Sequence, residues 1–248
     1  MIGVMTKRYF IILTLFLVGI TFYLGSNLRA SAVKDRYHYE NTGEIVWEIK
    51  TEEKIVALTF DDGPHPKYTA NILDILAKHN AKATFFVVGE LAEKNPDLIL
   101  RQYNEGHEIA NHTYTHQPKT SLSKLELELK QTDDLIFSIT GYRPELFRPV
   151  EGQYTDQMIQ SVVKKGYQVV MWSWDQDTED WKSPGVHRIE KKVLNNVEPG
   201  NIILFHDGGG NRSQTVKALE KIIEELQKQD YVFVTVSELI KIKNKPEK

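Results

Sequence analysis

The feature of this sequence that most constrains its fold is a regular alternation of short apolar segments with amphipathic ones between residues 45 and 234. Residues 55–60 and 83–88 have the continuous apolar character of strands that are buried on both faces. Residues 72–76, which lie between them, are apolar on one helical face. Strands that alternate with helices form a parallel sheet. Six or seven such units in one domain of about 200 residues predict an α/β fold, a nearly closed (β/α) barrel of about seven parallel strands.

The same periodicity places the other elements. We expect further strands at residues 46–49, 107–110, 146–147, 168–172, 201–205 and 231–234. We expect helices after Pro66, from Pro96 to about residue 103, and at or near residues 123–140, 155–165, 186 onward and 213–229. Ser123 and Glu126 form a capping box that predicts the start of the third helix, and Gly141 predicts its end.

Polar side chains follow five of the predicted strands, at the point where each strand ends. In a barrel of this kind the chemistry lies at the carboxyl ends of the strands. The side chains at these ends are Asp61 and Asp62, His112 and His116, Arg148 and Glu151, Asp175, Asp177 and Asp180, and His206. The sequence therefore predicts a single active site on one rim.

The composition limits the chemistry of that site. The chain has eight histidines and no cysteine, which excludes disulfides, thiolate metal ligands and thiol nucleophiles. A bound metal must therefore be held by His, Asp or Glu. The formal net charge is −3, and it becomes −6 without residues 1–32, which contain three basic residues and no acidic one. This acidic remainder argues against nucleic acid as a partner, because nucleic acids are bound by an excess of Lys and Arg.

Histidine and carboxylate spacing points to a metal. His112 and His116 are four residues apart and can face one ion from a helical turn or a similar loop. Two histidines and one carboxylate leave positions for water, as in a hydrolytic zinc site. Of the adjacent Asp61 and Asp62, one can bind the metal while the other acts as a base. Either signal alone would also fit a polar surface turn, but their convergence favours the metal site.

Three further side chains have plausible roles. His206 follows a buried strand, and acidic residues on the neighbouring strand end can orient it and raise its pKa, which would make it a proton donor. Arg148 can hold a carboxylate in place. Trp181 can offer an aromatic face to a sugar ring, whereas Trp172 better fits core packing.

These residues fall within five ordered motifs: residues 59–64 (TFDDGP), 112–116 (HTYTH), 148–152 (RPVEG), 177–181 (DTEDW) and 204–207 (LFHD). Together they resemble the motifs of polysaccharide deacetylases, the NodB-homology enzymes of carbohydrate esterase family 4. The resemblance covers roughly residues 52–240. It implies a distorted (β/α) barrel and metal-dependent removal of N- or O-acetyl groups from polysaccharides.

The resemblance also implies roles by motif position. Asp62, His112 and His116 would bind zinc or another divalent ion such as Co²⁺, Ni²⁺ or Mn²⁺. Asp61 would be the general base, and His206 the general acid.

The remaining motif positions imply supporting roles. Arg148 would orient Asp61, and a backbone N–H near Glu151 would stabilise the oxyanion together with the metal. Trp181 and Leu204 would border the substrate.

Two motifs depart from the family pattern. In the third motif, Val150 and Glu151 replace the usual Pro and Tyr, which removes an aromatic wall but keeps the backbone donor. Substrate choice and rate are therefore left open. The fourth region, residues 172–181, is two residues longer than usual. Counting back from Trp181 gives Asp177 as the partner of His206, whereas counting forward from the strand gives Asp175, and we favour Asp177.

The N-terminus has the pattern of an export signal. Lys7 and Arg8 precede an apolar run at residues 9–24, and the small residues 30–32 (ASA) provide a cleavage site. As a helix this run reaches about 24 Å, which is short of the roughly 30 Å hydrocarbon core. We expect residues 1–32 to be a signal peptide or membrane anchor, 33–51 an extension with a short strand, 52–240 the catalytic domain and 241–248 a basic tail.

These features predict an exported, monomeric enzyme at the cell surface, with membrane contact only through residues 9–24 if they are not cleaved. The first hypothesis is a peptidoglycan N-acetylglucosamine deacetylase that also acts on chitin-like oligomers. The second is an exopolysaccharide or chitooligosaccharide deacetylase or an acetylxylan esterase. The third is a wall-binding protein with a weak site.

Overall fold

The computed structural model describes residues 34–243, so the predicted signal or anchor and the last five residues of the predicted tail lie outside the described residues. In the described part of the chain, every helix is too short or too polar to span a bilayer. The contacts divide the chain between Arg36 and Tyr37, and the second unit contains all of the sheet. The following description concerns this second unit.

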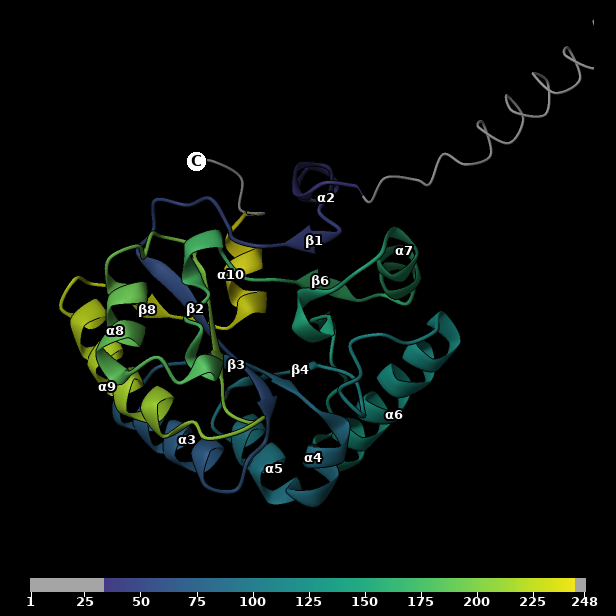
Figure 1. The fold of residues 1–248 in the computed structure, drawn as a ribbon, viewed down its shortest axis with the longest axis horizontal. Helices are drawn as coiled ribbons and strands as arrows, with labels where there is room; N and C mark the ends of the chain where they lie inside the picture. Colours follow the sequence, from purple (N-terminus) through teal and green to yellow (C-terminus); the bar gives the residue numbers. More distant parts are fainter. Residues whose placement is uncertain (1–33, 244–248) are drawn as a thin grey trace, which may run out of the picture. The chain divides into compact units, whose positions relative to one another are not determined.

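A curled sheet of parallel strands forms its centre (Figure 1). Seven strands are ordered β1-β6-β5-β4-β3-β2-β7, and β8 pairs with the start of β2. Their bounds are β1 (Ile45–Val46), β2 (Ile55–Gly63), β3 (Ala83–Val87), β4 (Glu108–Asn111), β5 (Leu146–Phe147), β6 (Gln168–Val170), β7 (Ile202–His206) and β8 (Val232–Phe233). The predicted distorted, nearly closed (β/α) barrel of about seven parallel strands is confirmed.

The central strand β2 sets the register of the site. Phe60 pairs with Phe85 of β3 and Phe205 of β7, and its ring stacks on theirs at centroid distances of 5.1 and 5.6 Å. One residue later, Asp61 pairs with His206. Apolar stacking below the rim therefore brings the polar ends of two distant motifs side by side.

The barrel closes between its two end strands through irregular chain. Ser173 donates its N–H to the carbonyl of Ile202 at 3.0 Å and its hydroxyl to the carbonyl of Trp47 at 3.1 Å. Glu48 forms an isolated antiparallel bridge with Asn201. These bonds supply the backbone partners that a closed sheet would otherwise provide.

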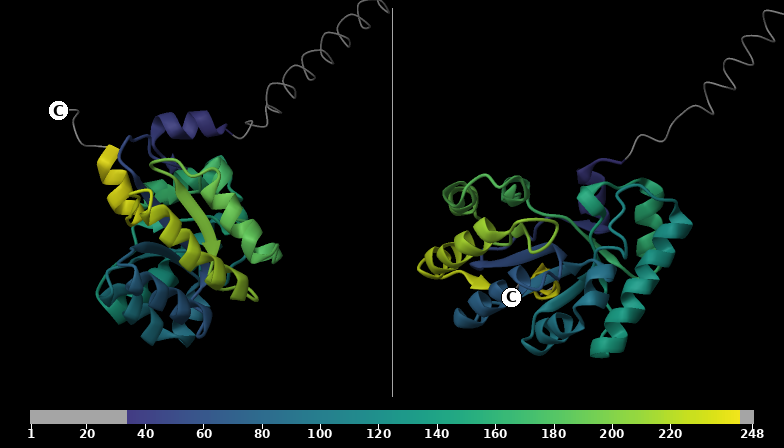
Figure 2. Two further views of the ribbon diagram at one scale, coloured as in Figure 1. Left: turned by 90° about the vertical axis from the view of Figure 1, so that its left-hand side faces the viewer. Right: turned by 60° about the horizontal axis from the view of Figure 1, so that its bottom comes forward.

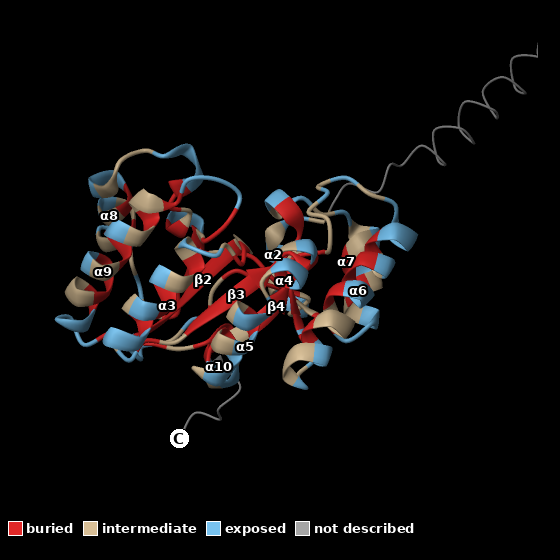
Figure 3. Cartoon of the chain, turned by 90° about the horizontal axis from the view of Figure 1, so that it is seen from below, coloured by how far each residue is buried: buried red, intermediate tan, exposed pale blue. Residues whose placement is uncertain are grey.

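Helices pack around the outside of the strands, as the views in Figures 1 and 2 show. Their bounds are α2 (Arg36–Thr42), α3 (Tyr68–Lys78), α4 (Gly89–Lys94), α5 (Pro96–Asn104), α6 (Leu122–Thr140), α7 (Asp156–Lys164), α8 (Val186–Leu194), α9 (Ser213–Gln227) and α10 (Val236–Lys243). Short 3₁₀ turns are η1 (Val150–Gly152), η2 (Trp174–Gln176) and η3 (Asp180–Lys182). In Figure 3 the strands β2, β3 and β4 are coloured as buried, with exposed residues on the outer helix faces.

Several boundaries differ from the sequence expectation. Helix α6 begins two residues earlier than the capping box suggested, because Ser121, and not Ser123, is its N-cap and accepts the N–H of Lys124 at 3.3 Å. The short helices α2 and α4 were not predicted. Helix α10 was not predicted either, and it continues into the expected basic tail as far as Lys243.

Two glycines test how tightly the barrel closure is packed. A Cβ on Gly200 (φ +84°) would lie 1.7 Å from the carbonyl oxygen of Ile49, whereas one on Gly166 (φ +94°) would meet nothing within 4 Å. We expect Gly166→Ala to cost about 1–2 kcal/mol for its left-handed backbone. Gly200→Ala adds overpacking and should cost about 2–5 kcal/mol in urea unfolding. Equal losses in the two variants would contradict the close approach.

Candidate active site

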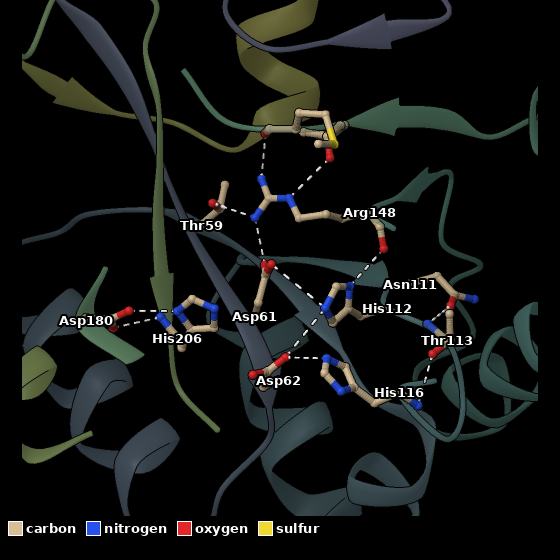
Figure 4. Close-up of polar contacts among 12 residues, drawn as sticks. Thr59, Asp61, Asp62, Asn111, His112, Thr113, His116, Arg148, Asp180 and His206 are labelled. Atoms are coloured by element: carbon tan, nitrogen blue, oxygen red, sulfur yellow. Dashed lines mark hydrogen bonds and ion pairs between the residues drawn. The ribbon is translucent and has the colours of Figure 1, made fainter. Parts of the chain in front are cut away.

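The two aspartates at the end of β2 face different partners because the strand is irregular there. Successive side chains of a strand point to opposite faces. The register of β2 against β3 shifts between Asp61 and Gly63, and Asp62 has a left-handed φ of 71°. This bulge turns both carboxylates toward the rim, where Asp61 is 4% exposed. Figure 4 shows them side by side at the centre of the site.

Arg148, which follows β5, is fully buried beneath Asp61. Its Nη1 donates to Asp61 Oδ1 at 2.7 Å and to the Thr59 hydroxyl at 2.9 Å. Its Nε and Nη2 donate to the carbonyls of Val170 and Met171 at 3.2 and 2.8 Å. The predicted contact between Arg148 and Asp61 is therefore present, and the guanidinium fixes one oxygen of that carboxylate.

Asp62, His112 and His116 form a group whose ligand atoms all lie within 4.8 Å of one another. Asp62 Oδ1 lies 2.9 Å from Nε2 of His116 and 3.5 Å from Nε2 of His112. Burial works to raise the pKa of Asp62, but hydrogen bonds from the two histidines and the positive charge of His112, in the form in which these rings are doubly protonated, outweigh it and hold the pKa far below its usual range. Asp62 in turn raises the pKa of His116.

The hydrogen bonding of His112 fits a metal ligand. Its Nδ1 lies 2.8 Å from the carbonyl oxygen of Arg148, which can only accept, so Nδ1 carries the proton. In the neutral ring, Nε2 then presents its lone pair toward the carboxylate of Asp62. Two electron-rich atoms that face each other are the arrangement that a cation stabilises, and a carbonyl behind the ring is a common support for a metal-bound histidine. The residues present therefore fit a divalent ion.

A loop, and not a helix, carries the two histidines. The amide oxygen of Asn111 accepts the N–H of Thr113 at 2.9 Å, and the Thr113 hydroxyl accepts the N–H of His116 at 3.1 Å. Thr113 and His116 both have left-handed backbones, with φ of 71° and 55°. Glu128 of α6 accepts the hydroxyl proton of Thr115 at 2.6 Å. These bonds hold a strained loop in which the spacing of four residues still brings both rings to one point.

A second group of possible ligands lies between α3 and α9, away from the strand ends. It contains His79, Glu220 and Glu224. Lys78 already pairs with Glu220 at 2.5 Å, so that carboxylate has a cation partner.

His206 is oriented by Asp180, so the prediction of Asp177 as its partner is wrong, as is the alternative Asp175. Asp180 Oδ1 lies 2.7 Å from Nδ1 of His206, and its Oδ2 accepts the backbone N–H of His206 at 3.0 Å. The hydroxyl of Thr215 also donates to Oδ2, at 2.7 Å. Asp180 begins the turn η3, which aims its side chain back at β7.

The other two aspartates have different positions. Asp177 forms a backbone bridge with Leu204, and its carboxylate accepts the N–H of Glu179 at 3.0 Å. Asp177 lines the site pocket, but the carboxylate that contacts His206 is that of Asp180. Asp175 lies in η2 and lines a different hollow.

Burial and charge oppose each other at the His206–Asp180 pair. Burial works to lower the pKa of His206, but the hydrogen bond and charge of Asp180 outweigh it and raise the pKa above its usual value. Burial likewise works to raise the pKa of Asp180, and the bonds from His206 and Thr215 hold it below its usual value. The arrangement thus favours a protonated imidazole with Nδ1 held by the carboxylate.

All of these groups border one pocket of about 540 Å³. Its lining residues are Asp61, Asp62, His112, His116, Glu151, Gly152, Trp172, Asp177, Trp181, Leu204, His206, Gly209 and Arg212. The predicted substrate-binding residues Glu151, Trp181 and Leu204 are thus brought to the site. Trp172, assigned to the core, is partly buried and also lines it.

Sequence reasoning missed two buried groups at this site. Arg212 is 3% exposed and donates to the carbonyl of Gly208 at 2.7 Å, and nothing in its local sequence marks it as a pocket residue. Asp207, beside His206, accepts from the Thr69 hydroxyl at 2.5 Å, and burial raises its pKa to about 7. The sequence signal that could have marked Asp207 is its position in the fifth motif, residues 204–207.

The comparison with known proteins agrees with this geometry. The family profile "Polysaccharide deacetylase" matches residues 48–170. A peptidoglycan-N-acetylglucosamine deacetylase of Bacillus cereus is 47% identical over 210 residues, which are 84% of this chain and 99% of that protein. The chain therefore belongs to the polysaccharide deacetylase family.

Two further relatives extend this comparison. The chain is 38% identical to the peptidoglycan-N-acetylmuramic acid deacetylase PdaC of Bacillus subtilis, with 80% of this chain aligned to 41% of that longer protein. The crystal structure of the Bc1960 peptidoglycan N-acetylglucosamine deacetylase superposes with a TM-score of 0.79 at 35% identity, covering 83% of this chain and 97% of that one. Both relatives are named as deacetylases of acetylated amino sugars of peptidoglycan.

The contact between His206 and Asp180 predicts a specific pH effect. Were His206 the proton donor, it would be active only while protonated, below its pKa, and Asp180 raises that pKa. We expect Asp180→Asn to lower turnover by about tenfold or more and to move the loss of activity at alkaline pH to a lower pH. Asp177→Asn is the matched control and should keep the wild-type pH profile. An unchanged profile in Asp180→Asn, or a larger shift in Asp177→Asn, would reverse the assignment.

Proposed function

We propose that this chain is a metal-dependent hydrolase that removes N-acetyl groups from N-acetylglucosamine units of peptidoglycan and releases acetate. The observation that carries the proposal is the meeting of three groups in one pocket: the Asp62, His112 and His116 cluster, the carboxylate of Asp61, and the imidazole of His206. They come from the ends of three strands, β2, β4 and β7, and together they supply metal ligands, a base and an acid.

The donor set suits Zn²⁺. Two imidazole nitrogens and one carboxylate oxygen are the ligands of many hydrolytic zinc sites, and Co²⁺, Ni²⁺ and Mn²⁺ are alternatives with the same donors. When bound, such an ion supplies Lewis acidity that activates water and polarises an acyl carbonyl.

Asp61 is proposed as the general base. Arg148 holds its Oδ1, so its Oδ2, which lies 3.9 Å from Nε2 of His112, is the oxygen nearer the metal ligands. That oxygen can take the proton of the attacking water. Because Arg148 is buried and uses its other N–H groups on backbone carbonyls, the carboxylate cannot rotate away without losing a charged partner.

The oxyanion and the leaving amine need separate donors. In the turn η1, the N–H groups of Gly152 and Gln153 donate to the carbonyls of Pro149 and Val150 at 3.0 Å each. The first N–H groups of such a turn have no acceptor within it. We therefore propose the N–H of Glu151 as the oxyanion donor, and Nε2 of His206 as the donor of a proton to the departing nitrogen.

The sugar is proposed to lie against the aromatic residues of the pocket. Trp181 is 52% exposed and lines the rim, with Lys182 Nζ 4.8 Å from its ring centroid. Glu151 occupies the third-motif position where a Tyr is usual, and it adds a carboxylate to the lining of the same pocket. Peptidoglycan is the preferred substrate because the relatives described above act on it, with chitooligosaccharides, exopolysaccharide and acetylxylan as the alternatives.

The proposed substrate also determines where in the cell envelope the enzyme has to act. Peptidoglycan lies outside the membrane, so the enzyme must be exported. We propose that residues 1–32 direct export as a signal peptide or anchor, ahead of a catalytic domain at residues 52–240.

Loss of one of the metal-binding side chains should remove the metal. We expect Asp62→Ala and His116→Ala to lose the bound ion, measured by metal analysis after dialysis of the purified protein. His187→Ala is the matched control, because that side chain is 76% exposed on α8 and does not line the pocket. Retention of a stoichiometric ion by both ligand variants would refute the site.

Substitution of the proposed base should affect turnover and not metal binding. We expect Asp61→Asn to keep the metal and to lose about a hundredfold or more of turnover. The assay is acetate release from peptidoglycan, chitooligosaccharides and acetylxylan, each with and without a chelator. Peptidoglycan should give the fastest chelator-sensitive release. Normal release by Asp61→Asn would exclude its role as base, and release from acetylxylan alone would replace the proposed substrate.

A further inference from the structure

Arg212, which precedes α9, is a buried cation in the catalytic pocket that the proposed reaction does not use. Its side chain is 3% exposed, and it is the one Arg or Lys among the described residues that line this pocket. Its Nε donates to the carbonyl oxygen of Gly208 at 2.7 Å, which ties the side chain to the loop that follows β7. The guanidinium is therefore held in place at the pocket without a chemical task assigned to it.

The terminal nitrogens of Arg212 have no acceptor within residues 34–243. Its side chain forms a hydrogen bond there only through Nε, and neither Nη1 nor Nη2 is a fully enclosed atom. Arg148, the other buried arginine of the site, directs Nε, Nη1 and Nη2 to acceptors. A guanidinium has five N–H donors, and a buried charge without a partner costs free energy. Arg212 can therefore bind an acceptor that enters the pocket.

The loop of residues 208–210 places this guanidinium beside the metal-binding cluster. A Cβ on Gly209 would lie 3.3 Å from Nη2 of Arg212 and 2.6 Å from Oδ2 of Asp62, so both groups reach the same point above that glycine. Asp62 forms no ion pair with Arg212, and its Oδ1 faces His112 and His116. The two terminal nitrogens therefore lie next to the place where a glycan would present its acetamide.

The chemistry of a guanidinium selects the kind of ligand. Its planar set of N–H donors matches a carboxylate, which accepts two parallel bonds, and such charge-assisted bonds are stronger than bonds to neutral hydroxyls. Peptidoglycan carries carboxylates close to its acetamides. Its N-acetylmuramic acid has a lactyl ether whose carboxyl group is either free or joined to a peptide with carboxylates of its own. Chitin-like oligomers have no such group.

We propose that Arg212 is a specificity-determining residue that binds a carboxylate of the glycan through Nη1 and Nη2. The inference rests on the proposed function, which places an acetamide of the same glycan at Asp61 and His206. The bound carboxylate supplies the counter-charge that the buried guanidinium lacks in the free enzyme. Arg212 thereby makes the enzyme prefer carboxylate-bearing peptidoglycan to a neutral chitin-like chain.

Steady-state acetate release by the full, metal-loaded chain tests the proposal. Two soluble peptidoglycan glycans are used, strands without peptides and strands that keep their peptides. Each is compared with a counterpart whose carboxylates have been converted to methyl amides. We expect the wild-type KM for the carboxylate form of at least one glycan to be about tenfold lower than for its amide form, and this advantage to shrink as salt is raised. The glycan that shows the difference identifies the source of the carboxylate.

Variants of Arg212 locate the effect. Arg212→Leu should raise the KM for that carboxylate form about tenfold, with kcat, and the KM for the amide form and for a neutral chitooligosaccharide, within about twofold of wild type. Arg212→Lys keeps the charge without the paired donors and should retain part of the preference. Arg188→Leu is the matched control, because it removes a positive charge from an exposed position on α8 outside the pocket, and it should leave every KM unchanged.

Two results would overturn the assignment of Arg212. Equal wild-type KM values for the carboxylate and amide forms of both glycans would do so without any variant. An equal loss on charged and neutral substrates in Arg212→Leu would do so as well, and metal analysis of that variant would then show whether the residue supports the metal-binding cluster.

The proposed reaction fails by a different result. If the metal-loaded wild-type chain releases no acetate from any of these glycans, the reaction is overturned. The glycans are then not converted, so isothermal titration of the same carboxylate and amide pairs onto wild type and Arg212→Leu decides whether this residue binds the carboxylate.

Discussion

The buried guanidinium of Arg148 is the interaction on which the rest of the site depends. It is fully buried, it lies 4.0 Å from the ring centroid of Phe86, and it donates to Asp61, Thr59 and two carbonyls of the β6 end. Its own carbonyl accepts from His112. Removing one member of a buried ion pair costs about 3–5 kcal/mol, because the other charge is left without a partner. A single residue therefore links the proposed base, a metal ligand and the inner face of the barrel.

The parallel register explains why residues so far apart in sequence meet. Asp61 pairs with His206, and Asn111 pairs with Phe147, so β2, β4, β5 and β7 end at one level. Apolar residues below this level, such as Phe60, hold the strands together by stacking, and polar residues follow at once. Burial of the core and placement of the chemistry are thus two results of the same alignment.

Much of this arrangement was predictable from local signals. The apolar alternation gives the barrel, and the strand-end polar residues give Asp61, Asp62, His112, His116 and His206, because strand ends lie at fixed points in the periodicity. The partner of His206 was not predictable in the same way. Asp175, Asp177 and Asp180 lie within six residues of one another in irregular chain, and the left-handed backbone of Glu179 decides which carboxylate turns toward β7. Helix α10 was also missed, because its apolar residues follow a predicted strand without a clear stop signal.

The bulge at Asp62 has a further consequence for how the site can change. A regular strand would direct the two neighbouring side chains to opposite faces, so only one of the two carboxylates could reach the rim. Here a single left-handed residue decides the direction of both carboxylates. An insertion or deletion within residues 61–63 would therefore move the proposed base and the proposed metal ligand together, and the site would lose both functions in one step. A change of side chain at Asp61 or Asp62 would remove one proposed role, whereas a change of length in this segment would remove both.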